Sequence, residues 1–302
     1  MAGEVVTVSV GGRNLKLSNL DKVLYPEAGF TKGEVIDYYV AVSGALLPHL
    51  AGRPVTLRRY PDGVDAESFF AKNIPGHAPD WVRRVELPSS HSARGVTEYV
   101  MVEDLPTLVW TANLAGLELH VPQWRIDDDD VAEPPDLLVF DLDPGPSTTV
   151  VECCLVAELI REVLDEDGLV GHPKTSGAKG LQLYAPVVAT GGRTTSEYAK
   201  AVAERLAREH PDTITATMAR RERPGKVFID WSQNNPAKTT VAPYSLRARP
   251  HPTVSTPVGW DEVADCRSPD DLRFTAADVR ERLAEDGDLL DGLHADPVPL
   301  PG

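Results

Sequence analysis

The sequence predicts a mixed α/β protein, built as one continuous unit with two lobes of sheet and flanking helices around a cleft. Short runs rich in Val, Leu, Ile and Phe alternate with longer segments of helical periodicity. Turn signals such as Pro61-Asp62-Gly63 separate them, and no repeat or linker divides the 302 residues. A chain of this length can bury a substantial core.

The N-terminal half is expected to begin with a strand pair over residues 1–17. Residues 31–50 are typical of a helix, with Thr31 as its N-cap and Glu34 in the position of a capping box. The other elements expected here are a strand from residue 53 that ends in the 61–63 turn, a helix over 105–116, and strands over 97–102 and 117–121.

The C-terminal half is expected to form around one buried strand, LLVFDLD, at residues 137–143. A long helix over 147–168 is expected to start at Ser147 and Thr148. The other expected elements are a loop leading into a strand over 172–187, a helix over 196–211 and a strand over 226–232. The Pro-rich end predicts a flexible tail at 291–302, which leaves 1–290 as the domain.

Charge is distributed unevenly along the chain. The formal net charge is −16, which by itself argues against a polyanionic partner. However, residues 127–143 hold eight acids and no base, whereas residues 218–249 hold seven bases and two acids. The local field decides what a cleft attracts, so the acidic balance does not exclude nucleic acid.

The chain carries no sign of export or membrane insertion. No apolar run approaches the roughly 20 residues of a membrane span, and the N-terminus lacks the layout of a signal peptide. Cys153, Cys154 and Cys266 form neither a disulfide framework nor a spaced zinc site, so we expect them to be buried. The four aspartates at 127–130 are interpreted as a solvated loop. We expect a cytoplasmic protein without a membrane partner.

Two carboxylates end the central strand. Asp141 and Asp143 are two residues apart, so in a strand they point to the same face about 6–7 Å apart. Such a pair repels unless a cation lies between the groups, and hard divalent ions bind oxygen ligands of this kind. The alternative is that the two side chains cap the following helix or lie in a solvated loop.

A second strand adds a third carboxylate. Asp230 ends the apolar run of KVFID, and three aspartates at the ends of two core strands resemble the trio that holds two metal ions for nucleotidyl transfer. Between these strands lies TSGAKGLQLY, a glycine-containing turn with Ser176 and Lys179. Small residues let backbone N–H groups approach phosphate, and lysine supplies a point charge.

Taken together, these motifs resemble the polymerase domain of bacterial ATP-dependent DNA ligase D, in the archaeo-eukaryotic primase-polymerase superfamily. The resemblance covers almost the whole chain. It is carried by LSNLDKVLYP, FTKGEVIDYY, GRPVTLRRYPDG, FFAKN, LELHVPQWR, LVFDLDPG, TSGAKGLQLY, KVFIDWSQN, KTTVAPYSLRAR and DGDLL. HVPQWR, DLDPG, and DWSQN followed by APYSLR are jointly very specific. The resemblance implies a primase-polymerase fold in a stand-alone form.

The resemblance also implies residue roles. Asp141, Asp143 and Asp230 match the catalytic trio that binds two Mn²⁺ or Mg²⁺ ions. Lys22 and Lys32 match lysines that hold the 5′-phosphate of a gapped or broken DNA end, and Phe69 and Phe70 match an aromatic pair that stacks on template bases. The matched nucleotide-binding positions are Arg58, His120, Ser176, Lys179, Gln182, Gln233 and Arg247.

Several of these residues also have a purely structural interpretation. The two lysines could be solvated surface residues, one of the two phenylalanines could belong to the core, and His120 could be a hydrogen-bonded core histidine. Two positions depart from the family pattern. Arg58 stands where the family often has lysine, a change that keeps charge but alters geometry. Gln182 stands where the family usually has histidine, and glutamine can donate a hydrogen bond but carries no charge. The metal site is unaffected, so we expect catalysis to survive; triphosphate affinity and rate are the properties on which this exchange bears.

The implied function is template-directed addition of ribo- or deoxyribonucleotides at gaps and ends during non-homologous end joining. The implied partners are DNA with a 5′-phosphate, rNTP or dNTP, the Ku end-binding protein and a separate ATP-dependent DNA ligase. The protein would then associate with the nucleoid during repair.

Two other functions stay open from the sequence. One is a phosphatase of the haloacid-dehalogenase type, whose first motif also ends a strand in DxD; here Pro144-Gly145 replaces its usual Gly-Thr. A covalent aspartyl-phosphate would identify it. The other is a catalytically weakened DNA-end-binding module, which would bind gapped DNA without metal-dependent extension.

Overall fold

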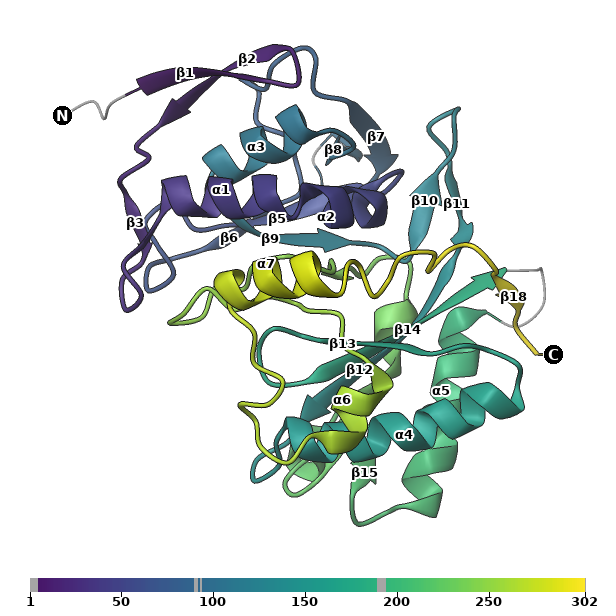
Figure 1. Cartoon of the computed structure of the whole chain (residues 1–302). Coiled ribbons are helices and arrows are strands. Elements are labelled where there is room, and N and C mark those ends of the chain that lie inside the picture. The colour runs from purple at the N-terminus through teal and green to yellow at the C-terminus, as the bar shows by residue number, and fades with distance from the viewer. Residues whose placement is uncertain (1–4, 90–91, 93, 189–193, 302) are drawn as a thin grey trace.

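The computed structural model describes residues 5–89, 92, 94–188 and 194–301, so the first four residues of the expected N-terminal strand lie outside it. Two lobes stand one above the other in Figure 1, each built on its own sheet. Each lobe has its own hydrophobic core. The expected two-lobed mixed α/β architecture is confirmed.

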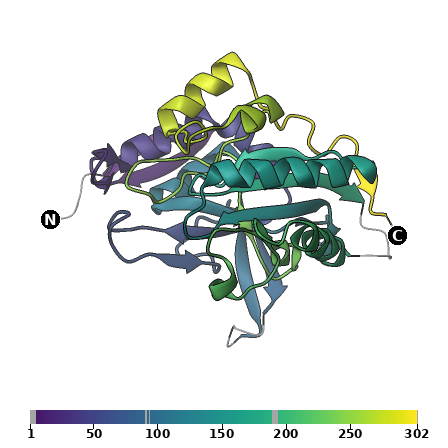
Figure 2. The same cartoon turned by 90° about the horizontal axis from the view of Figure 1, so that it is seen from below.

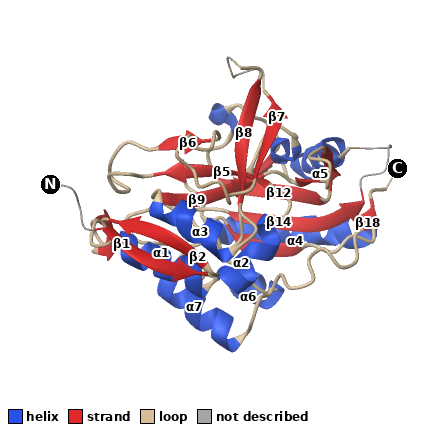
Figure 3. Ribbon diagram, turned by 90° about the horizontal axis from the view of Figure 1, so that it is seen from above, coloured by secondary structure: helices blue, strands red, loops and turns tan. Residues whose placement is uncertain are grey.

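The first lobe holds a sheet of strand order β17-β9-β5-β8-β7, with β6 also paired to β5. Its elements are the hairpin strands β1 (Val5–Val10) and β2 (Arg13–Ser18), β3 (Val23–Tyr25), β4 (Phe30–Thr31), α1 (Lys32–Ala41), α2 (Ser43–Leu50), β5 (Pro54–Arg59), β6 (Phe69–Ala71), β7 (Arg84–Pro88), β8 (Val96–Met101), α3 (Leu105–Asn113), β9 (Gly116–Val121) and β17 (Thr240–Val241). Seen from above, the β7–β8 hairpin projects away from the helices of this lobe (Figure 3).

The second lobe holds a sheet of order β13-β14-β12-β16-β15, with β18 also paired to β14. Its elements are β12 (Leu137–Pro144), α4 (Val150–Glu166), β13 (His172–Thr175), β14 (Leu181–Val188), α5 (Thr195–Glu209), β15 (Ile214–Thr215), the 3₁₀ turns η1 (Arg220–Glu222) and η2 (Trp231–Asn234), β16 (Val227–Asp230), α6 (Trp260–Asp265) and β18 (Val298–Pro299). The hairpin of β10 (Trp124–Ile126) and β11 (Ala132–Pro135) and the helix α7 (Ala276–Glu285) complete the chain.

The two faces of β12 have different surroundings. Leu138, Phe140 and Leu142 belong to the core that α4 and α5 cover, and Figure 2 shows α4 running along this sheet. Alternation along a strand sends Asp141 and Asp143 to the opposite face. The helices therefore cover one face of the sheet and leave the aspartates on the other.

Several predicted elements are confirmed. Thr31 and Glu34 form the expected capping box at the start of α1. LLVFDLD lies in the middle of its sheet as predicted. The three cysteines are buried and free. The four aspartates at 127–130 form the turn of the β10–β11 hairpin, with the last three exposed.

Three expected elements differ. The helix expected over 31–50 breaks at Val42 into α1 and α2, because the hydroxyl of Ser43 bonds the carbonyl of Val40 and Gly44 is a poor helix former. The long helix starts at Val150 rather than at Ser147, since Thr149 and Glu152 make the capping box. The loop expected before the 181–188 strand contains β13, so the segment is a hairpin.

The C-terminal segment lies on the second lobe. Leu293 is buried with Leu290 against β12 and β14, and β18 pairs in parallel with β14. The expectation of a flexible tail over 291–302 remains a prediction about motion. Within the described residues, no helix is long and apolar enough to cross a membrane.

Candidate active site

Four strands bring one side chain each into a row across the second sheet. Asp141 on β12 lies opposite Gln182 on β14 and opposite Asp230 on β16, and Gln182 lies opposite Lys174 on β13. Residues directly opposite each other share a face, and Asp143 joins this face because it lies two residues beyond Asp141. The structure therefore brings the three predicted aspartates together.

Side chains beside the aspartates hold their carboxylates in place. The amide of Gln182 donates to Oδ1 of Asp141 at 2.9 Å. The amide of Gln233 reaches Oδ2 of Asp230 at 3.1 Å and Oδ2 of Asp141 at 3.4 Å. Ser232 donates its N–H and hydroxyl to Oδ1 of Asp230, and Lys238 bonds that hydroxyl in turn.

Burial and mutual repulsion disfavour the charged forms of two of the aspartates. Burial raises the pKa of Asp141, and the charge of Asp143 raises it further. Burial and the charge of Asp230 likewise raise the pKa of Asp143, against the opposing effect of Arg223 and Arg247. In both cases the ionised form is disfavoured, first because burial removes water from the carboxylate and second because a neighbouring aspartate repels it.

This donor set fits a hard divalent cation, because it offers three carboxylates on one face that repel one another. As the side chains stand, no group of three or more His, Cys, Asp or Glu within the described residues surrounds a single point. The amides of Gln182 and Gln233 occupy carboxylate oxygens instead. A divalent ion would therefore have to displace these amide groups from the carboxylate oxygens in order to bind.

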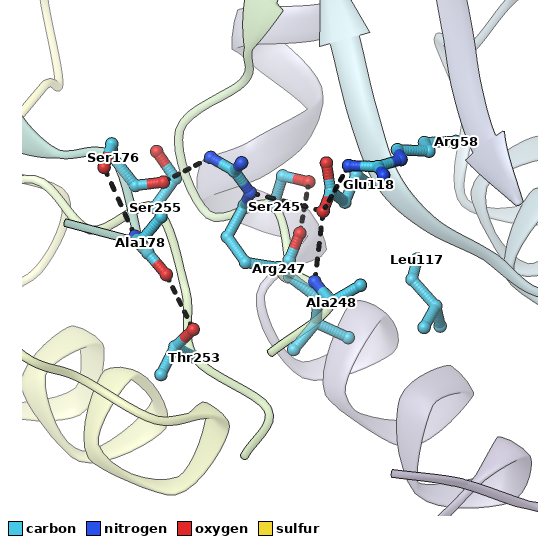
Figure 4. Close-up of polar contacts among 12 residues, drawn as sticks. Arg58, Leu117, Glu118, Ser176, Ala178, Ser245, Arg247, Ala248, Thr253 and Ser255 are labelled. Carbon is cyan, nitrogen blue, oxygen red and sulfur yellow. Dashed lines mark hydrogen bonds and ion pairs between the residues drawn. The ribbon is translucent and has the colours of Figure 1, made fainter. Parts of the chain in front are cut away.

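The turn between β13 and β14 is shaped to approach a ligand closely. The hydroxyl of Ser176 accepts the N–H of Ala178 at 3.2 Å (Figure 4). It also accepts the N–H of Gly180 at 3.1 Å. Gly177 has φ +65°, and a Cβ there would lie 2.6 Å from the backbone of Val254, so this position requires glycine. Lys179 is exposed at the tip.

A cavity of about 940 Å³ lies beside this turn. It extends along Pro144 to Val150, where the first turn of α4 directs its N–H groups outward. No acidic side chain is among its lining residues in the described part of the chain. The cationic side chains that line it are Lys179, Arg220, Arg223 and Arg273. Such a lining suits phosphate groups.

Three of the predicted nucleotide-binding residues converge on a carboxylate that the sequence analysis did not select. Glu118 on β9 lies opposite Arg58 on β5 and two residues from His120. Its carboxylate lies 3.0 Å from Nε2 of His120, 3.4 Å from Nε of Arg247 and 3.8 Å from Nη1 of Arg58. Figure 4 shows both arginines directed at it.

Charges in this cluster are fixed near neutral pH. Burial alone would raise the pKa of Glu118, but the hydrogen bond of His120 and the charge of Arg247 outweigh it and lower the pKa to about 2. Burial lowers the pKa of His120, although Glu118 partly opposes this. A neutral His120 then donates Nε2–H to Glu118, which leaves Nδ1 as its acceptor.

Two exposed phenylalanines border this cluster. Phe69 and Phe70 on β6 are 48% and 57% exposed, so two adjacent aromatic rings lie on the surface. Phe70 lies opposite Arg58 in the sheet and contacts the ring of His120 edge-on, at 5.6 Å between centroids. Both predicted stacking residues therefore lie on the surface, and neither is a core residue.

Of the two predicted phosphate-binding lysines, Lys32 is the first residue of α1 and Lys22 directly precedes β3; the N–H of Lys32 donates to the carbonyl of Lys22 at 2.8 Å. Lys32 is only 5% exposed, and its Nζ donates to the carbonyl of Ser18 at 2.6 Å. Burial, with the charges of Lys22 and Arg59, lowers the pKa of Lys32 to about 8. Lys22 is paired with Asp62 at 2.7 Å. Their interpretation as two solvated lysines fails for Lys32.

Sequence reasoning did not identify Glu118, Lys174, Arg220, Arg223 or Arg273 as site residues. Lys174 is fully buried, and its Nζ donates to Ser255 Oγ at 2.5 Å. In the sequence, nothing distinguished it from other lysines of predicted loops. Glu118 had a clearer signal, since it stands two residues before His120 in a predicted strand.

Comparison with known proteins agrees with this geometry. The family model of the LigD primase-polymerase domain matches residues 31–290. The multifunctional non-homologous end joining protein LigD of Mycolicibacterium smegmatis is 47% identical over 283 residues, which cover 93% of this chain and 36% of that protein. The bifunctional non-homologous end joining protein LigD of Bacillus subtilis is 35% identical over 275 residues, covering 90% and 43%. The chain thus spans less than half the length of these relatives.

A solved structure of the polymerase domain from Mycobacterium tuberculosis ligase D in complex with DNA is also similar. It superposes with a TM-score of 0.85 at 43% identity, covering 94% of this chain and 99% of that one. The expected fold is confirmed, and the phosphatase alternative is not retained. The chain therefore belongs to the LigD primase-polymerase domain family, whose members are metal-dependent nucleotidyltransferases.

Proposed function

We propose that this chain fills gaps and extends DNA ends that carry a 5′-phosphate, adding rNTP or dNTP under the direction of a template during non-homologous end joining. One observation carries the proposal. Asp141, Asp143 and Asp230 share one face of a sheet next to a glycine-containing turn and a cavity lined with cations. This arrangement pairs acidic ligands for metal with basic ligands for phosphate.

The three aspartates would hold two divalent ions, Mn²⁺ or Mg²⁺. When bound, such ions lower the pKa of an attacking hydroxyl and neutralise charge on the triphosphate. The raised pKa values of Asp141 and Asp143 support this role, because burial and the repulsion between neighbouring aspartates disfavour their charged forms, and a bound cation would favour them. Gln233 bridges Asp141 and Asp230 and keeps their carboxylates close in the metal-free protein.

Residues of the turn and cavity would bind the nucleotide. Ser176 and Lys179 belong to the turn, where backbone N–H groups and a point charge can meet the triphosphate. Arg220 and Arg223 extend the positive surface, and Arg223 is held by its contact with the ring of Phe228, 3.7 Å from the centroid. Arg58, His120 and Arg247 would contact the nucleotide from the other lobe.

Gln182 is proposed to act on the nucleotide through Asp141. Its amide donates to Asp141, and its side chain is only 4% exposed. Its Oε1 is buried without a hydrogen-bond partner. A histidine at this position could carry charge where glutamine cannot, so the exchange would weaken the hold on phosphate or slow the reaction.

The DNA would be held by the first lobe. Phe69 and Phe70 are exposed and flat, and stacking on template bases accounts for that exposure at about 1–3 kcal/mol per base. Lys22 and Lys32 would hold the 5′-phosphate. The names of the relatives place LigD in end joining, and we propose that the chain works there with Ku and an ATP-dependent DNA ligase.

A gap-filling assay tests the proposal. The substrate is a 5′-phosphorylated gapped duplex, with rNTP or dNTP and either Mn²⁺ or Mg²⁺. We expect template-directed addition by the wild-type chain and none by Asp141→Ala, with gapped-DNA binding retained by both. Binding without any metal-dependent extension by the wild type would instead identify a catalytically weakened end-binding module.

A further inference from the structure

The carboxylate of Glu118 is a point where four side chains from three segments meet. Oε2 accepts the hydrogen bond from His120, while Oε1 faces Arg247, Arg58 and the hydroxyl of Tyr60 at 3.4, 3.8 and 3.4 Å. Oε1 also accepts the backbone N–H of Ala248 at 3.1 Å (Figure 4). The two oxygens thus have different sets of partners.

Burial makes these contacts consequential. The Glu118 side chain is 2% exposed, and a buried carboxylate is costly unless cations and donors surround it. Of the two arginines beside it, Arg58 is 36% exposed and Arg247 is 16% exposed. Glu118 therefore sits behind these groups as their fixed anionic partner.

Arg247 shows how the position of one group is set from both lobes. Its Nε faces Glu118 of the first lobe at 3.4 Å, and its Nη1 donates to the carbonyl of Ser176 in the turn of the second lobe. A guanidinium held at two points has few orientations left. Without Glu118, the contact with Ser176 alone would not define its plane.

We propose that Glu118 is a positioning residue of the polymerase reaction, which orients Arg58, His120 and Arg247 toward the incoming nucleotide without touching it. This inference rests on the proposed function, because it assumes that the three groups bind the nucleotide. It predicts that loss of the carboxylate weakens nucleotide binding more than it affects folding or DNA binding.

The test variant is Glu118→Gln, measured by gap filling with Mn²⁺ over a range of nucleotide concentrations. Glutamine keeps the shape and an acceptor for the N–H of Ala248, but it has no charge and presents an amide donor toward Nε2–H of His120. We expect KM for the nucleotide to rise about 10- to 100-fold, the range for loss of charge-assisted hydrogen bonds. We expect kcat and the Kd for gapped DNA to change little, while the melting temperature falls because the cations around Glu118 lose their buried anionic partner.

Asp136 offers a matched control. It too lies between two arginines and a histidine, with Arg53, Arg125 and His294 at 2.6, 2.8 and 3.6 Å, although its side chain is 27% exposed. It precedes Asp141 by five residues of extended chain, about 16 Å. Asp136→Asn should therefore lower stability while leaving KM for the nucleotide unchanged.

A double-mutant cycle separates positioning from a general structural effect. In an Arg247→Gln background, Glu118→Gln should add a smaller factor to KM than in the wild type, because one of its targets is already gone. Equal factors in both backgrounds overturn the proposal, as does an unchanged KM in Glu118→Gln.

Failure of this inference differs from failure of the proposed function. If the wild-type chain does not extend gapped DNA, the function itself is wrong. If it extends DNA and Glu118→Gln keeps its KM, only the role of Glu118 is wrong. Should Glu118→Gln not fold, Glu118→Asp replaces it: the charge is kept but withdrawn by one methylene, so KM should still rise, and an unchanged KM overturns the proposal.

Discussion

Replacing Asp141 by Asn should stabilise the metal-free protein while it abolishes nucleotide addition. The exchange preserves the shape of the side chain and its Oδ1 acceptor, which receives the amide of Gln182 at 2.9 Å. It removes one of three neighbouring negative charges. We therefore expect that a site selected for metal binding lowers the stability of the protein while no metal is bound.

The size of the effect follows from the register of the strands. Asp143 lies two residues along β12, about 6–7 Å away, and Asp230 lies directly opposite Asp141. Two unit charges at that distance repel by about 2–3 kcal/mol at an effective dielectric constant of 20. Protonation of one carboxyl in the wild type already relieves part of this repulsion. We therefore expect Asp141→Asn to raise the free energy of unfolding by about 1–3 kcal/mol. That corresponds to a few degrees in melting temperature for a chain of this size.

The effect should depend on pH with a defined sign. Because the pKa of Asp141 is raised in the folded state, the native protein binds more protons than the unfolded chain between the two pKa values. Wild-type stability contributed by this group therefore falls as the pH rises through the folded-state pKa. The advantage of Asp141→Asn should be largest at pH 8 and should shrink toward pH 5.

Urea or thermal unfolding in EDTA at several pH values measures this difference. Added Mn²⁺ should raise the melting temperature of the wild type more than that of the variant, since the ion binds the folded state. If the Asp141→Asn variant is less stable than wild type in EDTA at pH 8, the reasoning is refuted, because the carboxylates would then not be repelling one another.

Three further predictions concern single positions. Phe70→Ala should weaken gapped-DNA binding about 10- to 100-fold through loss of stacking. The melting temperature should not change, because the side chain is 57% exposed. Equal binding of the variant and the wild type in fluorescence anisotropy would contradict a stacking role. The preference for a 5′-phosphate should fall between pH 7 and 9, because Lys32 has a pKa of about 8 and loses its charge as the pH rises through that value. The variant Lys32→Met should lose the preference at every pH. A wild-type preference that does not depend on pH would contradict the role of Lys32. Gln182→His should increase kcat/KM for the nucleotide in gap filling, and no gain would show that this position does not limit the reaction.

Local patterns determined much of this protein. The apolar run of LLVFDLD predicted a buried strand, and alternation placed Asp141 and Asp143 on one face. The capping box at Thr31 marked the start of a helix correctly, because a cap depends on neighbours three residues away. These features depend on residues close in sequence, so the sequence alone could predict them.

Tertiary structure decided what lies beside what. Asp230 is 89 positions from Asp141 in the chain, and only antiparallel pairing of β12 with β16 sets them opposite each other. Lys174 was expected in a loop, but β13 pairs with β14 and buries this lysine in the same row of side chains as Gln182 and Asp141. Glu118 became identifiable only when Arg247, from a segment 129 residues later, folded against it. Burial and charge pairing between residues so far apart in the chain depend on the packing of both lobes. Local sequence periodicity therefore could not predict them.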